Sequence, residues 1–129
     1  MSGPFIAITS GRIREGKLAG YRELNAAITA RVDEQEPRVI AFHVMLSEDG
    51  ERFTSVQVHP DVQSMEFHIK VVGDLIKGAG ELIQVETFTV LGASNESFDA
   101  YMKAMADSGI TIRHLPNHLR GFTRSSAAV

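Results

Sequence analysis

The stretch RVIAFHVML-SEDGE-RFTSVQVH-PDVQSMEFHIK, residues 38–70, decides the fold of this 129-residue chain. Residues 39–46 are apolar on both faces apart from His43, and apolar residues alternate with polar ones in 53–59, which predicts two strands. Asp49-Gly50 between them is a hairpin signal, because glycine accepts the positive φ of such turns. Pro60-Asp61 then suits the first turn of a helix. The stretch therefore predicts strand, tight turn, antiparallel strand and helix.

The flanking segments supply the remaining elements. A first strand is predicted from Phe5 to as far as Arg14, followed by a helix from about Lys17 to Glu34 that Pro37 brings to an end. After the central stretch we expect a strand, a helix with Ser94 or Asn95 as its N-cap, a short strand and a tail. In the tail we expect Gly121-Phe122 to dock on the domain and the chain from Ser125 onward to be loose. The strand is expected over 82–91, the helix over 94–108, the short strand over 110–115 and the tail over 116–129.

The order strand, helix, strand, strand, helix, strand is the split βαβ, ferredoxin-like pattern. We expect one α+β domain over residues 1–129, with a core of about 5–91 and a C-terminal helix and tail over 94–129. Its antiparallel sheet would carry both helices on one face. The strands are apolar on both sides, so the other face also needs a cover. A second copy of the chain is the economical one, which predicts a homodimer through the sheet face.

Composition excludes several classes of protein. The chain has no cysteine, which excludes thiol catalysis, disulfides and iron–sulfur clusters and fits a reducing cytoplasm. The formal net charge is -3 and the basic residues are scattered, so we expect no nucleic-acid partner. No apolar run approaches the roughly 20 residues of a membrane span, so we expect no membrane partner. The N-terminus lacks the features of a secretion signal.

The strongest candidate for chemistry is His68, on the apolar stripe of the helix that follows Pro60. It is either a buried, hydrogen-bonded structural histidine or a pocket histidine that exchanges a proton near neutral pH. Tyr21 and Asn25 lie one turn apart on the inner face of the first helix, and Gln57 is a polar residue that can face inward. We predict that these four side chains converge in an apolar cavity that orients a small apolar or aromatic ligand.

The other histidines of the central stretch are harder to place. His43 faces away from Phe42, either under the helices or at the dimer interface, and is a further ligand-binding candidate. His59 ends its strand beside Pro60, where we expect a capping role. A metal site built from His43, His59 and His68 would need all three to converge, and their spacing forms no local ligand motif. We therefore predict no metal.

Residues 5–91 resemble the dimeric α/β-barrel superfamily, which includes the antibiotic-biosynthesis monooxygenases and quinol-monooxygenase-like proteins. The resemblance lies in the element order, in the Glu36-Pro37 exit into a strand, and in HPDVQSMEFH over residues 59–68. A histidine is common on the second helix of that family, and His68 occupies such a position. The chain differs from the haem-degrading branch by having no tryptophan, and it adds the helix at 94–108.

The resemblance implies a homodimer with a pocket between each sheet and its own helices. It further implies a monooxygenase that uses dioxygen and no cofactor on a quinol-like or aromatic compound. In that case His68 would remove a hydroxyl proton, and the resulting anion would pass an electron to dioxygen. Two alternatives stay open. The chain is a non-catalytic carrier or sensor that uses the same cavity, or it is a structural protein whose pocket is filled by side chains.

Overall fold

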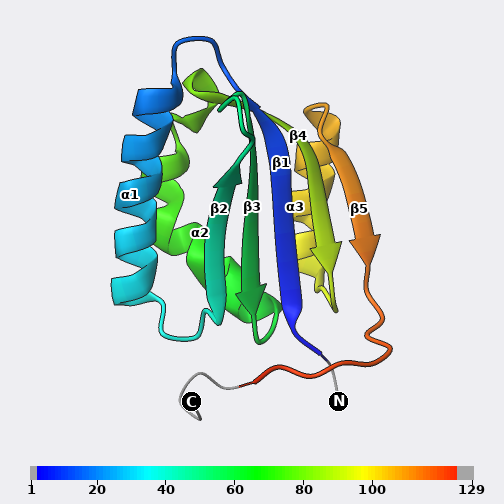
Figure 1. The fold of residues 1–129 in the computed structure, drawn as a ribbon. Coiled ribbons are helices and arrows are strands. Elements are labelled where there is room, and N and C mark those ends of the chain that lie inside the picture. The colour runs from blue at the N-terminus through cyan, green and yellow to red at the C-terminus, as the bar shows by residue number, and fades with distance from the viewer. Residues whose placement is uncertain (1–2, 125–129) are drawn as a thin grey trace.

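The computed structural model describes residues 3–124 (Figure 1). Five strands and three α-helices follow one another in the predicted order, with one short 3-10 helix after the second α-helix. In chain order they are β1 (Phe5–Ile13), α1 (Leu18–Gln35), β2 (Ala41–Leu46), β3 (Arg52–His59), α2 (Val62–Ile76), η1 (Ala79–Glu81), β4 (Ile83–Leu91), α3 (Glu96–Asp107) and β5 (Thr111–Leu115). The expected looseness from Ser125 onward lies outside the described residues.

The strands form one sheet in the order β2-β3-β1-β4-β5. The first four strands of this order pair antiparallel, which is the ferredoxin-like arrangement expected from the sequence. The fifth strand, β5, pairs parallel to β4. The sheet is therefore mixed and not wholly antiparallel, because α3 provides the crossover that a parallel neighbour requires.

The helices all lie on one face of the sheet (Figure 1). One cluster of buried residues joins β1 and β4 to α2 and α3, with Phe5, Phe88 and Phe98 at its centre. A second cluster joins α1 to α2 through Ile28, Val32 and Val72. Arg31 adds a polar link between these helices, since its guanidinium donates to the Val71 carbonyl oxygen at 3.1 Å. α1 and α2 are thus held against each other on this face of the sheet.

Helix starts follow the predicted capping chemistry. The carboxylate of Asp61 accepts a hydrogen bond from the backbone of Ser64 at 3.0 Å, and Asn95 caps α3 through the backbone N–H of Phe98 at 2.8 Å.

The expected docking of Gly121-Phe122 is wrong, because Phe122 is 80% exposed.

A bulge in β4 faces Gly11 of β1, where the pairing shifts by one residue after Ser10. A Cβ at Gly11 would lie 2.0 Å from the carbonyl oxygen of Gln84. Only glycine lets the two backbones approach so closely. The bulge lies near the start of β4.

The sheet face opposite the helices is apolar along its middle. Ile6 lies directly opposite Val58 and Ile8 directly opposite Val56 on neighbouring strands. Met45, on the same face of the edge strand β2, is 59% exposed. No segment of residues 3–124 covers this face (Figure 1).

Within residues 3–124, none of the helices combines the length and apolar character of a membrane span.

Candidate functional site

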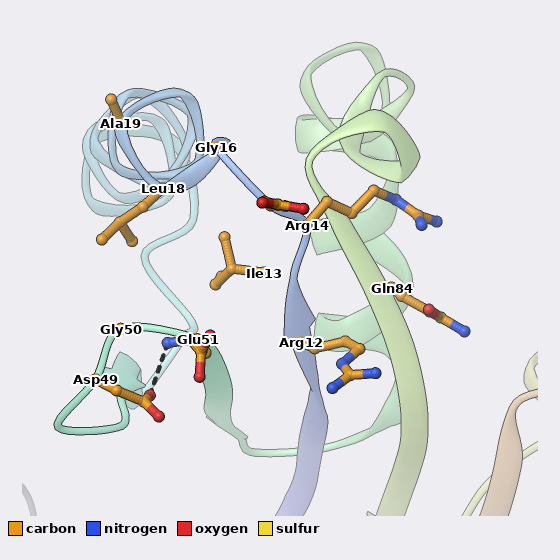
Figure 2. Close-up of a pocket in the computed structure, with 11 residues that line it drawn as sticks. Arg12, Ile13, Arg14, Gly16, Leu18, Ala19, Asp49, Gly50, Glu51 and Gln84 are labelled. Carbon is orange, nitrogen blue, oxygen red and sulfur yellow. Dashed lines mark hydrogen bonds between the residues drawn. The ribbon is translucent and has the colours of Figure 1, made fainter.

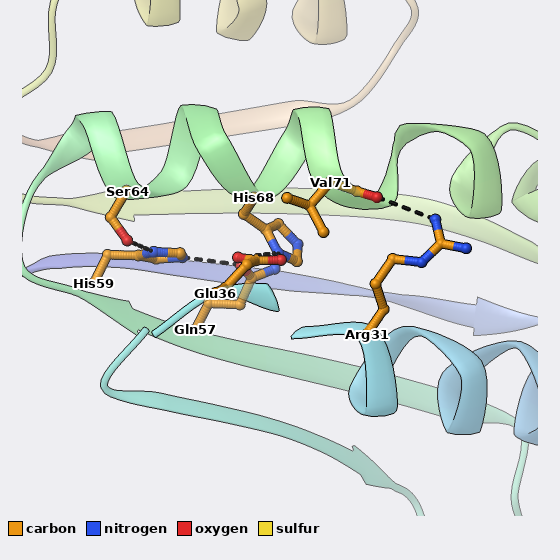
Figure 3. Close-up of polar contacts among 7 residues, drawn as sticks. All are labelled: Arg31, Glu36, Gln57, His59, Ser64, His68 and Val71. Atoms are coloured by element: carbon orange, nitrogen blue, oxygen red, sulfur yellow. Dashed lines mark hydrogen bonds and ion pairs between the residues drawn. The ribbon is translucent and has the colours of Figure 1, made fainter. Parts of the chain in front are cut away.

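A buried carboxylate and a buried imidazole meet between α1 and α2. Both carboxylate oxygens of Glu36 lie 3.0 Å from Nδ1 of His68 (Figure 3). The Glu36 side chain is 1% exposed and that of His68 is 7% exposed. Removing a carboxylate from water is expensive unless a partner compensates it, so this contact is what allows Glu36 to be buried.

The chain brings these two groups together from both sides of the hairpin. Glu36 is the residue at which α1 ends, and its backbone N–H still donates to the Val32 carbonyl oxygen at 2.9 Å. Pro37 prevents the helix from continuing, so the chain leaves toward β2 while the Glu36 side chain stays on the inner face. His68 projects from α2 one turn after Ser64, toward the same space.

The contact fixes the proton arrangement of His68. Burial lowers the pKa of His68 from its ordinary value, and the Glu36 carboxylate opposes that shift. A neutral imidazole whose Nδ1–H donates to Glu36 carries its lone pair on Nε2. Nε2 has no hydrogen-bond partner among residues 3–124, and no buried polar atom there is unsatisfied. It is therefore an accessible acceptor, and His68 lines a cavity.

That cavity has a volume of about 120 Å³ and lies between α1, α2 and the sheet. It brings together four of the five predicted site residues, Tyr21, Asn25, Gln57 and His68. Most of its other walls are apolar, with Phe42 packed 5.8 Å from the His68 ring between ring centroids. Burial raises the pKa of Tyr21, with the Asn25 side chain opposing the shift. The ligand-binding role of these residues stays a prediction.

His43, the fifth predicted residue, lies outside this cavity. It is exposed on β2 and borders a groove of about 610 Å³ between that edge strand and α1. The groove shares four residues with the cavity, namely Tyr21, Asn25, Phe42 and Val44. These four residues therefore separate the groove from the cavity.

His59 does not cap α2 as expected, since Asp61 does. Its ring is fully buried between two partners, with Nδ1 at 2.7 Å from the Ser64 hydroxyl and Nε2 at 3.1 Å from Oε1 of Gln57. Burial, with His68 nearby, lowers the pKa of His59 to about 4. His59 is therefore neutral at pH 7, with one donor and one acceptor nitrogen.

A wider depression of about 710 Å³ lies between the β1–α1 turn and the β2–β3 hairpin (Figure 2). Its charged side chains spread outward: Arg14 bonds the Gly80 carbonyl oxygen at 2.7 Å, and Asp49 bonds the backbone of Glu51 at 2.9 Å. No buried titratable group faces it. We therefore assign the candidate site to the smaller cavity, where buried polar groups point at one space.

Within the described part of the chain, no three histidine, aspartate or glutamate side chains are grouped as a metal site would require. His59 and His68 lie with ring centroids 6.0 Å apart, whereas His43 belongs to the exposed face of β2. The three histidines weighed as a metal site do not converge.

Two residues of the site were not foreseen from the sequence. Glu36 was considered only as part of the Glu36-Pro37 exit from the first helix, although it continues the four-residue spacing Leu24, Ile28, Val32 of the inner face. A carboxylate at such a position also opposes the helix dipole, which favours cations at a C-terminus. The spacing was therefore the available signal. Ser64 gave none, since small hydroxyl residues are common in first helical turns.

Comparison with known proteins extends the description to relatives of the fold. No protein-family model matches the sequence, and no curated protein matches it by sequence. Solved structures do match. MupZ from Pseudomonas fluorescens superposes with a TM-score of 0.73 at 19% identity, over 96% of this chain and 91% of that one.

Two shorter structures match about three quarters of this chain. A Caulobacter crescentus protein provisionally named an antibiotic biosynthesis monooxygenase has a TM-score of 0.64 at 12% identity, over 73% of this chain and 92% of its own. Rv0793 from Mycobacterium tuberculosis has a TM-score of 0.62 at 19% identity, over 74% of this chain and 99% of its own. The ferredoxin-like fold of the antibiotic-biosynthesis-monooxygenase-like proteins, expected from the sequence, is confirmed. The match to MupZ covers nearly the whole chain.

The two buried histidines predict that the fold loses stability in mild acid. Folding lowers the pKa of His59 from 6.5 to about 4 and lowers that of His68 as well. Between these pH values the unfolded chain binds more protons, so the free energy of unfolding decreases as the pH falls. We expect a decrease of about 2 kcal/mol between pH 7 and pH 4.5 in urea denaturation.

Substitution separates the His59 contribution from the rest. His59→Gln lacks one titrating group, so its free energy of unfolding should change less over the same pH range than that of the wild type. His118→Gln, at an exposed position after β5, is the matched control and should follow the wild type. An acid dependence in His59→Gln as steep as in the wild type would show that His59 is not the group responsible.

Proposed function

We propose that this protein binds a small hydroxylated aromatic compound in the cavity beside His68 and oxidises it as a cofactor-independent monooxygenase. The observation that carries the proposal is the Glu36–His68 pair at the cavity wall. A neutral imidazole oriented by a buried carboxylate is the usual arrangement of a general base. The names of several structural neighbours, provisionally called antibiotic biosynthesis monooxygenases, support the same class of reaction.

The volume of the cavity limits the size of the ligand. A dry engineered cavity of about 150 Å³ is known to hold benzene, so a space of this order accepts a single ring. The cavity has a volume of about 120 Å³ and largely apolar walls, which suits a quinol-sized compound. The groove between α1 and β2 shares wall residues with the cavity and is the proposed entry side.

In the proposed reaction His68 Nε2 takes the proton of a ring hydroxyl, and the imidazolium that forms is stabilised by Glu36. The ring anion transfers one electron to dioxygen, and the ring radical and superoxide combine at a ring carbon. His68 returns its proton to the peroxide. Loss of water then breaks the O–O bond and leaves a carbonyl, so a phenol C–H and one O₂ become a quinone and one H₂O. The protein supplies proton transfer and exclusion of water.

The role of His68 predicts a loss of activity on substitution. His68→Ala should abolish protein-dependent oxygen uptake with hydroquinone, because a positioned base contributes about 10²–10⁴-fold to rate. Glu36→Gln should reduce uptake by about 10-fold or more, since the amide stabilises the imidazolium less. The oxygen electrode is the measurement, with the rate without protein subtracted. His118→Ala, at an exposed position after β5 and outside both the cavity and the groove, is the control and should keep the wild-type rate.

Two outcomes would contradict the proposal. Unchanged oxygen uptake in His68→Ala would reject His68 as the base. Hydroquinone that binds the wild type but is recovered unchanged would reject catalysis on this compound, and would favour a non-catalytic carrier or sensor.

We further propose that the open sheet face packs against a second copy of the chain. Support comes from the apolar pairs Ile6–Val58 and Ile8–Val56 in the middle of that face and from exposed Met45 beside them. Contiguous apolar surface of this kind marks interaction sites in soluble proteins. A twofold axis would bring the same patch of both copies together.

A charge at the centre of this patch tests the dimer. Wild-type protein should elute with twice the chain mass in light scattering, and Val56→Lys should be monomeric because an unpaired ammonium would be buried. Ala27→Lys adds the same charge on the exposed side of α1 and should remain dimeric. A wild-type protein that is monomeric at tens of micromolar, or a dimeric Val56→Lys variant, would overturn this arrangement.

A further inference from the structure

His59 is the most completely buried polar side chain near the cavity, yet it does not border it. Its relative exposure is 0%, and its two ring nitrogens are both within hydrogen-bond distance of a partner. Ser64 lies on one side, and on the other side lies Gln57, which does line the cavity (Figure 3). His59 therefore connects a buried hydroxyl to a residue of the candidate site.

Only one direction of these hydrogen bonds satisfies every group. Ser64 is buried, and the hydroxyl has no hydrogen-bond partner other than His59 among residues 3–124. Its proton consequently needs Nδ1 of His59 as its acceptor. A neutral imidazole that accepts at Nδ1 carries its proton on Nε2. Nε2–H then donates to Oε1 of Gln57.

This direction determines what Gln57 presents to the cavity. With its carbonyl oxygen held by His59, the amide turns its NH₂ group the other way. That group has no hydrogen-bond partner among the described residues, and no buried polar atom there is unsatisfied, so the NH₂ group is accessible. The cavity then contains a donor at Gln57 and an acceptor at Nε2 of His68. The opposite tautomer of His59 would reverse the Gln57 amide and present an acceptor at both places.

We propose that Ser64 and His59 hold the Gln57 amide with its NH₂ group toward the cavity, so that Gln57 selects ligands carrying an acceptor oxygen in addition to a hydroxyl. A ring carbonyl is such an oxygen. Ser64 and His59 are positioning residues, and Gln57 is the specificity-determining residue. The inference rests on the proposed function for the hydroxyl at His68, and it adds the second polar group of the ligand.

The tautomer of His59 is the first readout. Long-range ¹H–¹⁵N correlation on histidine-labelled protein at pH 7 should show His59 as a single neutral species protonated at Nε2. Ser64→Ala removes the group that selects this tautomer, so both tautomers should become populated. Ser55→Ala, which removes a hydroxyl on the same face of β3, should leave His59 unchanged. A wild-type His59 protonated at Nδ1 would overturn the proposal.

Ligand selection is the second readout, with 3- and 4-hydroxybenzaldehyde compared with 3- and 4-ethylphenol. The compounds of each pair have similar size, and only the aldehydes carry an acceptor besides the hydroxyl. In calorimetric titrations of the wild type, the better aldehyde should bind about 3–10-fold more tightly than its ethylphenol, the range of one net hydrogen bond. Gln57→Met keeps the side-chain length without the donor, and Ser64→Ala frees the amide.

Both substitutions should lower the ratio of the aldehyde affinity to the ethylphenol affinity. In Gln57→Met this ratio should fall to about 1–2. The ratio within each protein cancels general effects on the cavity, and comparison of the ratios between proteins isolates the amide. A wild-type protein that binds neither compound would reject the proposed function itself. Equal affinity for both in the wild type, or a ratio unchanged by Gln57→Met or by Ser64→Ala, would reject the role of the amide and leave the proposed function in place.

Discussion

The contact between the Glu36 carboxylate and Nδ1 of His68 is the constraint on which the site depends. A carboxylate that is 1% exposed has lost its water, and within residues 3–124 its hydrogen-bonded side-chain partner is this imidazole. Breaking a buried pair by removing one member typically costs several kcal/mol, because the other member is left uncompensated. The end of α1 and the middle of α2 are therefore held at a fixed separation, with the ring plane of His68 fixed between them.

The rest of the site follows from that placement. With Nδ1 occupied, the free nitrogen of His68 is the one that borders the cavity, and the packing of Phe42 against the ring keeps that side apolar. On β3, the alternation that buries Phe53 also points Gln57 and His59 toward the helices. A buried polar network survives in an apolar core only when each member is satisfied. Ser64 completes the network of Gln57 and His59.

Periodicity and turn chemistry were sufficient to predict the elements of the fold. The strand patterns of 38–46 and 53–59, the Asp49-Gly50 hairpin and the Pro60-Asp61 helix start all depend on residues that are neighbours in the sequence, and each matches the structure within a few residues. β2 starts at Ala41 and not at Arg38, because the chain after Pro37 turns before it pairs. The parallel pairing of β5 and the exposure of Phe122 depend on long-range packing that no local pattern encodes.

The site was predictable only where an inward-facing position carried a polar residue. Tyr21, Asn25 and His68 were predicted in this way, since each lies on an apolar helix face. Gln57 was predicted as a polar strand residue that can face inward. Glu36 had the same signal, but its place among acidic residues at a helix exit suggested a solvated group. The partners of His59 could not be predicted, because a residue at a strand end has no periodicity that shows which neighbour it meets.

The ring nitrogens of His68 test the central claim most directly. The measurement is the ¹⁵N shift of both nitrogens at pH 7, in free protein and in protein saturated with phenol. The account predicts a neutral ring protonated at Nδ1 in the free protein, and a large change at Nε2 when the phenol hydroxyl reaches it. A ring protonated at Nε2, or an Nε2 signal that bound phenol leaves unchanged, would contradict the claim that Glu36 directs His68 at a ligand in this cavity.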